Sequence, residues 1–256
     1  MLKHRVIPTL LIQDDALVKT IKFSAPKYIG DPINAIRIFN DKEVDELLVL
    51  DISNTRENRI PDYSLIEQFA TECFMPLCYG GGISTLDQAS TLFNLGVEKI
   101  CIQNAYIQNP RIISQISEKY GSQSVVVSLD LKKTLFGGVK IFDYSRRKYL
   151  HANWLNLVQR AIKFGAGEIL LNSVDNDGLM QGMAIDIISE ASDNISVPLI
   201  AAGGVGNLDN IKAGIEAGAS AIGVGSYFVF HGPHRAVLIT YPKYAELETL
   251  LKGINR

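Results

Sequence analysis

The 256-residue sequence has few of the residues that usually hold metals or form disulfides. It contains three cysteines, four histidines and one tryptophan. The cysteines, Cys73, Cys78 and Cys101, are an odd number without the spacing of metal ligands, and the histidines add no metal pattern to them. We therefore expect no metal site and no disulfide framework, but buried thiols of a cytosolic protein.

Long apolar runs and an excess of one charge are also absent. No run is long enough to cross a membrane and the N-terminus lacks the apolar segment of a signal peptide, so we expect a cytoplasmic protein without membrane contact. The net charge of −2 gives no electrostatic reason to expect nucleic acid as a partner. Hydrophobic residues make up 47% of the chain, which is enough for a sizeable core.

One stretch of the sequence occurs twice. Met75–Ile83 is an apolar run that ends in glycines, and Val197–Gly206 repeats it further along the chain. Each copy continues with Leu-Asp, a helical pattern, a glycine and a second apolar run. The second runs end at Gln103-Asn104 and at Gly225-Ser226. A self-similarity of this kind determines how the whole chain is interpreted.

The repeated unit is typical of phosphate binding. A strand that ends in adjacent glycines lets the backbone approach a ligand with no Cβ in the way. The helix that follows turns its free N–H groups and its positive dipole end toward the same point. Tight strand-to-helix turns are the alternative, but two copies in register favour two phosphate sites. The residues expected to form them are Gly81, Gly82, Asn104, Gly203, Gly204, Gly225 and Ser226.

Short β-rich runs alternate with amphipathic helical patterns along the chain. The expected strands are Val6–Leu11, Glu46–Asp51, Met75–Tyr79, Lys99–Ile102, Val125–Asp130, Glu168–Asn172, Val197–Ala201 and Ala221–Val224. The expected helices are Asp31–Lys42, Asp62–Glu72, Thr85–Leu95, Pro110–Lys119, Asn153–Phe164, Asp186–Asp193, Leu208–Ala217 and Tyr244–Leu251. Most strands are continuously apolar, as parallel strands covered on both faces are. The pattern predicts an α/β fold, a closed (β/α)8 TIM barrel.

The repeat also extends beyond the glycines. Glu46–Leu50 matches Glu168–Asn172, and Val6–Leu11 matches Val125–Asp130. We therefore predict a single domain made of two fused half-barrels, about residues 1–121 and 122–256. The two phosphate sites then lie on opposite sides of the active face, with the ends of the first and fifth strands between them.

Two connections are longer than packing requires. Gln13–Gly30 follows the first strand and Lys132–Ala152 follows the fifth. Both leave from the C-terminal ends of strands, where barrel active sites lie, so both are predicted to be active-site loops or lids. Inert hairpins are the alternative.

Asp130 is the expected catalytic residue at the centre of that face. It places an ionisable group at the end of the fifth strand, between the two phosphate sites, which favours a catalytic or ligand-contacting role over a helix cap or a loop salt bridge. The equivalent position on the first strand holds Leu11. Only half of a carboxylate pair is therefore present.

Many segments resemble the HisF family, the cyclase subunits of imidazole glycerol phosphate synthase. They are Arg5–Pro8, Val18-Lys19, Gly30–Pro32, Asp45–Leu47, Leu50–Ile52, Gly80–Ile83, Gly121–Gln123, Gly165–Leu171, Asp177-Gly178 and Gly203-Gly204. The resemblance implies a duplicated (β/α)8 barrel that binds a substrate with a phosphate at each end. It also implies that Lys19, Asp175 and Asp177 belong to substrate loops. No cofactor is implied.

The same resemblance implies a glutaminase subunit docked on the N-terminal face of the barrel, in a heterodimer. Its ammonia would enter past a charged ring and travel through the barrel interior. The matching positions are Arg5, Glu46, Lys99 and Glu168, each at the start of a strand. A structural ring of salt bridges is the alternative. Glu98, an acidic residue on the same face, adds to the matches and favours glutaminase pairing.

Departures from the family pattern point to a paralogous group. The family uses two aspartates for cyclisation; Asp130 matches one, but Leu11 replaces the other and cannot exchange a proton. In the paralogous group, linked to acetamidino-sugar biosynthesis in surface polysaccharides, the barrel passes ammonia to a separate ATP-dependent amidotransferase. Lys19–Phe23 and His231–Arg235 resemble that group. We favour this function; a cyclase of histidine biosynthesis and a non-catalytic module for a phosphorylated small molecule are the alternatives.

Overall fold

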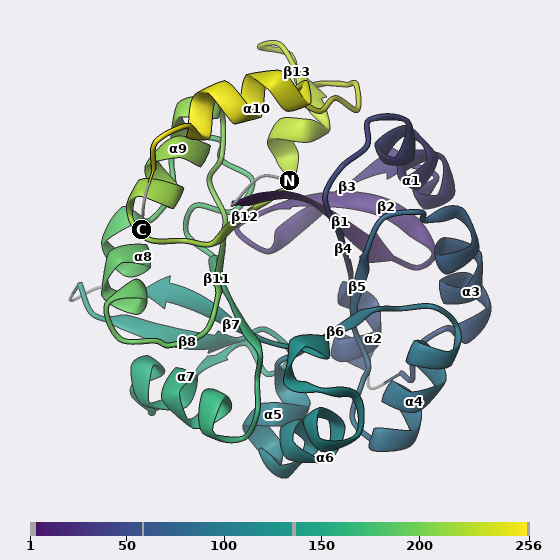
Figure 1. Cartoon of the computed structure of the whole chain (residues 1–256), viewed down its shortest axis with the longest axis vertical. Helices are drawn as coiled ribbons and strands as arrows, with labels where there is room; N and C mark the ends of the chain where they lie inside the picture. Colours follow the sequence, from purple (N-terminus) through teal and green to yellow (C-terminus); the bar gives the residue numbers. More distant parts are fainter. Residues whose placement is uncertain (1–3, 58, 135–136, 255–256) are drawn as a thin grey trace.

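Eight parallel strands close into a barrel in the computed structural model, which describes residues 4–57, 59–134 and 137–254. In order around the ring they are β1 (Arg5–Gln13), β4 (Leu47–Asp51), β5 (Leu77–Gly80), β6 (Lys99–Ile102), β7 (Val125–Lys133), β10 (Glu168–Ser173), β11 (Leu199–Ala202) and β12 (Ala221–Val224). The ring closes because β12 pairs in parallel with β1. The predicted strands and the predicted (β/α)8 barrel are confirmed (Figure 1).

Helices surround the strands on the outside of the ring (Figure 1). They are α1 (Pro32–Asp41), α3 (Tyr63–Glu72), α4 (Leu86–Asn94), α6 (Arg111–Tyr120), α7 (Trp154–Lys163), α8 (Ile185–Ser192), α9 (Leu208–Glu216) and α10 (Tyr244–Leu251). These helices lie where the helical patterns predicted them. Several begin at a side chain that accepts an N–H of the first turn, as Asp31 does for Asn34 and Asp62 does for Leu65.

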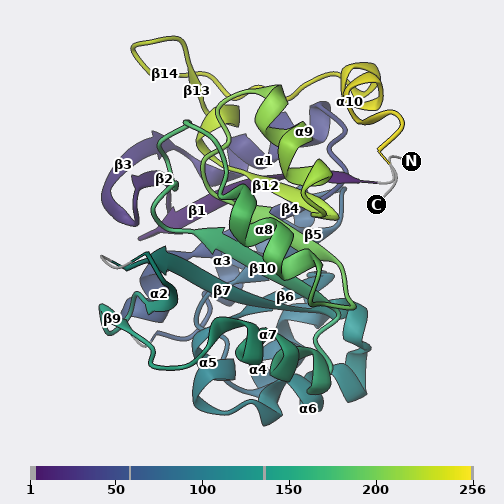
Figure 2. The same cartoon turned by 90° about the vertical axis from the view of Figure 1, so that its left-hand side faces the viewer.

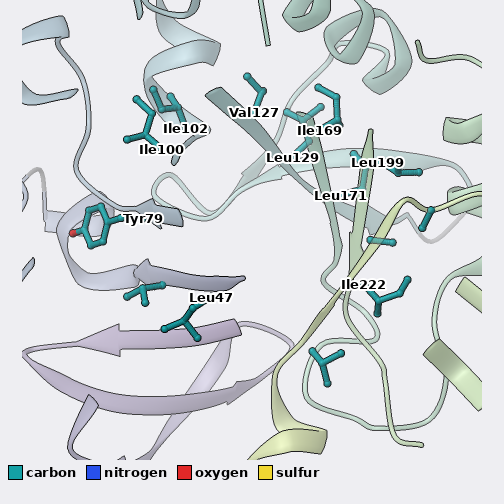
Figure 3. Close-up of a cluster of buried hydrophobic side chains, with 14 of the residues drawn as sticks. Leu47, Tyr79, Ile100, Ile102, Val127, Leu129, Ile169, Leu171, Leu199 and Ile222 are labelled. Atoms are coloured by element: carbon teal, nitrogen blue, oxygen red, sulfur yellow. The ribbon is translucent and has the colours of Figure 1, made fainter. Parts of the chain in front are cut away.

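Successive side chains of each strand point to opposite faces, so the barrel strands contribute to two separate layers of apolar side chains. Side chains such as Leu47, Tyr79, Val127 and Ile222 belong to the larger cluster, which the strands share with the surrounding helices (Figure 3). The intervening positions form a second buried cluster inside the barrel. Its members are Ile7, Leu48, Cys78, Cys101, Val126, Leu170, Ile200 and Ala221. The barrel is therefore filled by side chains at mid-height, and the site must lie above this layer.

The two long connections form β-hairpins that extend the barrel strands. β2 (Ala16–Ile21) pairs antiparallel with β1 and with β3 (Ser24–Gly30). β8 (Val139–Asp143) pairs antiparallel with β7 and with β9 (Lys148–Tyr149). A third hairpin, β13 (Phe230–His231) with β14 (Ala236–Val237), follows the last barrel strand. Figure 2 shows β3, β9 and β14 at the end of the molecule opposite to the chain termini.

Short helices at strand ends were not predicted. They are α2 (Ile52–Glu57), α5 (Asn104–Gln108) and the 3-10 turns η1 (Ser122–Ser124) and η2 (Ser226–Phe228). Segments of three to six residues are too short for a helical period to appear in the sequence. None of the helices in the described ranges is both long enough and apolar enough to cross a membrane.

The buried face of α3 provides a test of the packing. Phe69 is 1% exposed, whereas Phe74, five residues later, is 87% exposed. We expect Phe69→Ala to lower the free energy of unfolding by about 3–5 kcal/mol because it leaves a cavity. Phe74→Ala is the matched control and should change it by no more than about 0.5 kcal/mol. Urea denaturation measures both, and similar losses for the two variants would contradict this packing.

Candidate functional site

A cavity of about 320 Å³ lies at the C-terminal ends of the barrel strands. The predicted residues that line it are Leu11, Lys19, Gly81, Gly82, Asn104, Asp130, Asp177, Gly203, Gly204, Gly225 and Ser226. The fold thus brings together nearly all of the expected site. Asp175 is not part of the lining; its Oδ2 instead accepts the backbone N–H of Lys133 at 2.7 Å. Phe23 and Tyr144 line the cavity, so the hairpins that carry them contribute to the site.

The paired glycines are required by close backbone packing. Gly82 has φ +71°, and a Cβ there would lie 2.6 Å from the carbonyl oxygen of Arg59. Gly204 has φ +99°, and a Cβ there would lie 2.0 Å from the carbonyl oxygen of Gly182. A side chain at either position would be strained and would also clash. Packing alone explains these glycines, so phosphate binding stays a prediction.

The helices whose N-termini lie at the cavity are not the long helices that were expected to point there. The first turn of α4 is capped by its own side chains, since Thr85 Oγ1 accepts the N–H of Gln88 at 3.2 Å and Gln88 Oε1 accepts the N–H of Thr85 at 3.1 Å. Instead, the short segments α5 and η2 begin at the lining residues Asn104 and Ser226. A short extra helix is a common phosphate-binding element of this fold.

Asp130 is half-buried and its carboxyl is hard to ionise. Burial raises its pKa to about 7, and the negative charges of Asp177 and Asp143 add to the rise. A hydrogen bond with the Gln103 side chain opposes it. The Asp130 N–H also donates to Gln103 Oε1 at 3.2 Å, which fixes the two residues against each other. A carboxyl with this pKa can both take up and release a proton near neutral pH.

Asp177 places a second carboxyl in the cavity. It accepts hydrogen bonds from Thr20 Oγ1 at 2.9 Å and from the N–H of Phe23 at 3.3 Å, so it is tied to the β2–β3 hairpin. Burial raises its pKa despite these bonds. Lys19 is 4% exposed and donates to the carbonyl oxygen of Thr9. Burial lowers the pKa of Lys19 to about 8, while the charge of Asp177 acts in the opposite direction.

Asp51 is a third carboxyl at the cavity and was not predicted as a site residue. Its Oδ1 accepts from the N–H and Oγ of Ser53 and from the N–H of Asn54, and its Oδ2 accepts from Asn54 Nδ2. Burial raises its pKa in spite of these bonds. Asp51 follows an apolar strand just as Asp130 does, and that signal could have identified it. Both of its carboxyl oxygens therefore accept hydrogen bonds from residues at the start of α2.

The charged ring of Arg5, Glu46, Lys99 and Glu168 lies at the opposite end of the barrel. Lys99 Nζ donates to Glu46 and to Glu168, at 2.9 Å each. Arg5 donates to Glu46 and, at 3.1 Å, to Glu168. Burial lowers the pKa of Arg5 and of Lys99. The two carboxylates together have the larger effect, so the pKa of both residues is raised. The ring is internally paired, as a structural salt-bridge ring would be, so its role as an entrance stays a prediction.

Comparisons with known proteins match this chain over nearly its full length. The family model described as "Histidine biosynthesis protein" matches residues 5–234. A relative from Leptospira interrogans, provisionally named imidazole glycerol phosphate synthase subunit HisF, is 50% identical over 98% of this chain and 99% of its own. The chain belongs to the HisF family. Two other members, provisionally named as subunits hisF2 and hisF3, come from Pseudomonas aeruginosa and Vibrio vulnificus. They are 49% and 47% identical over 97% and 98% of this chain, and over 99% and 98% of their own.

Within residues 4–57, 59–134 and 137–254, no three His, Cys, Asp or Glu side chains gather in a way that could hold a metal ion. The ionisable side chains that line the cavity of this HisF-type site include the carboxyls of Asp130, Asp177 and Asp51 and the amine of Lys19.

The pKa of Asp130 leads to a prediction about stability. Its value of about 7 exceeds the value of about 3.9 for an unfolded chain, so the folded state binds this proton more tightly. The associated stability is fully present below about pH 4 and is lost as the pH rises through 7. Asp130→Asn mimics the neutral carboxyl, so we expect this variant to gain stability relative to the wild type between pH 5 and pH 8.

Denaturant unfolding at the two pH values measures the difference between variant and wild type. Thr71→Ala, which removes no ionisable group and lies on the exposed side of α3, is the control and should show no such pH trend. A difference that is equal at pH 5 and pH 8 for Asp130→Asn would contradict the raised pKa.

Proposed function

We propose that this chain is the HisF-like synthase subunit of a glutamine amidotransferase. It receives ammonia from a glutaminase partner at the N-terminal face and conducts it through the barrel. A separate ATP-dependent amidotransferase uses the ammonia for sugar amidination in surface-polysaccharide biosynthesis. The observation that carries the proposal is the contrast between the two ends of the barrel. The charged ring is complete, while Leu11 faces the cavity where a cyclase would need a carboxyl.

The layout of the interior supports a path between the two ends. Glu46, Lys99 and Glu168 belong to the ring, and the cavity lining includes the residues two positions further along the same strands: Leu48, Cys101 and Leu170. Two residues of strand correspond to about 7 Å. One apolar layer therefore separates the ring from the cavity floor. Ammonia is small and neutral, so it can cross such a layer where ions and larger molecules are excluded.

The names of the relatives also support a synthase subunit with a partner. They are named as subunits of imidazole glycerol phosphate synthase, and two carry the numbers 2 and 3. Numbered copies are expected where an organism holds more than one HisF-type protein. Within this proposal, the two glycine clusters bind a phosphorylated small molecule, and the two halves of the chain are the products of duplication.

Ammonia transfer provides the test of this function. Mixed with the glutaminase of the same organism, the chain should form a complex and raise glutamine hydrolysis. Lys99→Met leaves Glu46 and Glu168 paired with Arg5, yet removes one of the two cations at the entrance. We expect it to reduce glutamine-dependent amidation at least about tenfold, while amidation with added ammonium salt stays unchanged.

The control is Lys212→Met, which removes a cation from the exposed side of α9 and should behave as the wild type. The added ammonium salt separates passage through the barrel from later chemistry, because it bypasses the ring. A wild-type protein that forms no complex and gives no stimulation would overturn the proposal.

A second function, the cyclase of histidine biosynthesis, is favoured by one observation. Asp177 faces the cavity and interacts electrostatically with Asp130, so it could supply the carboxyl that Leu11 does not. If the chain is a cyclase, it should convert ammonia and the ribonucleotide substrate of the HisF family. Asp130→Asn and Asp177→Asn should each lower this turnover by about 10²–10⁴. Asp41→Asn, at the exposed end of α1 and outside the cavity lining, should not, and absence of turnover in the wild type would exclude the cyclase.

A further inference from the structure

The hairpin that follows β7 carries an unusual concentration of positive charge. Lys132–Ala152 contains six Lys or Arg residues and one acid, Asp143, although the whole chain has a net charge of −2. The acid is buried and faces Arg146 at 3.8 Å. Lys133 forms an ion pair with Asp186 at 2.9 Å. The other four cations have no carboxylate partner within the described part of the chain; they are Lys132, Lys140, Arg147 and Lys148.

These four residues, the cationic rim, include a pair of like charges in register. Lys132 of β7 lies directly opposite Lys140 of β8. Like charges at such a position destabilise a hairpin unless an anion lies close to both. Lys132 Nζ lies 4.9 Å from the centre of the Phe142 ring, a contact that relieves the repulsion only partly. An anionic group from outside the chain would stabilise the hairpin by offsetting this repulsion.

The cationic rim lies beside the mouth of the cavity but outside it. Tyr144 and Ser145, from the same hairpin, line the cavity, whereas none of the four rim cations does. The Tyr144 ring meets the Phe23 ring of the β2–β3 hairpin edge-on at 5.8 Å. The two hairpins therefore meet at the mouth. The rim cations are placed to contact something that covers the mouth rather than a small ligand inside it.

Exposed aromatic and apolar side chains belong to the hairpins at this end of the molecule, or follow directly after one of them. Tyr28 of β3 is 67% exposed and Tyr149 of β9 is 37% exposed. Leu238, just after the β13–β14 hairpin, is 52% exposed. Figure 2 shows these three hairpins at one end of the molecule. Exposed tyrosines beside charged groups are typical of protein interfaces.

We infer that the cationic rim docks the ammonia-accepting enzyme through an acidic face of that enzyme, so that the barrel mouth is covered when ammonia leaves. This inference rests on the proposed function. Ammonia that escapes into water is protonated and no longer acts as a nucleophile, so transfer requires a covered exit. Opposite charge on the two faces steers their encounter and fixes their orientation.

Charge reversal at the rim tests the docking. The components are this chain, its glutaminase and the ATP-dependent amidotransferase of the same organism. We expect Lys140→Glu together with Lys148→Glu to weaken binding of the amidotransferase at least about tenfold, and rising salt to weaken wild-type binding. Glutamine hydrolysis by the glutaminase complex should not change, because the glutaminase contacts the other face. Nitrogen from glutamine should then appear as free ammonia instead of amidated sugar.

Lys212→Glu on α9 is the control, with the same charge change away from the mouth, and it should bind the amidotransferase normally. Wild-type affinity in the double rim variant would overturn the docking. ATP or inorganic phosphate that binds the free chain and is lost in the double variant would also overturn it, because the lysines would then serve a small anion. A wild-type complex that forms but transfers no ammonia would contradict the proposed function and leave the docking intact.

Discussion

Closure of the strand ring is the constraint on which the rest of the structure depends. Because β12 pairs with β1 and β10 pairs with β7, the height of each inward side chain is fixed by its register. Glu168, Leu170 and Asn172 thus fall on three successive levels of one strand. The lowest level meets the charged ring, the middle level fills the barrel and the highest level reaches the cavity. A shift of register by one residue would exchange interior and exterior and destroy all three levels.

The sequence was sufficient for the barrel and for most of the cavity, and the reasons are physical. Buried parallel strands are continuously apolar, so their positions are visible without a structure, and strand ends then converge on one face. The hydrogen-bond partners of Asp51 and Asp177 are features that the sequence did not predict. Asp51 accepts hydrogen bonds from Ser53 and Asn54, and Asp177 accepts one from Thr20. These partners depend on hairpin geometry and on a six-residue helix. Neither produces a periodic pattern in the sequence, so neither could be predicted from it.

Leu11 lies at the position where the family resemblance implies a carboxyl, and this difference affects the electrostatics of the cavity. Asp130 already has a pKa of about 7 with Asp177 and Asp143 nearby. A further carboxylate from the first strand would raise that value again, since like charges resist joint ionisation. Leu11 removes this repulsion and adds apolar surface to the cavity wall. Asp130 therefore lies in the cavity without a second carboxyl from the first strand.

The two ends of the barrel then have complementary electrostatic roles. At the lower end Glu46 and Glu168 are each shared between two cations, so a passing ammonium ion would have to displace Lys99 or Arg5 from a carboxylate. At the upper end the rim lysines, which have no carboxylate partner among the described residues, repel cations near the cavity mouth. Both ends disfavour ammonium, and the apolar layer between them disfavours any ion. Under the proposed function, neutral ammonia would meet none of these barriers, so the charge pattern of the barrel would select for the form of the molecule that can react.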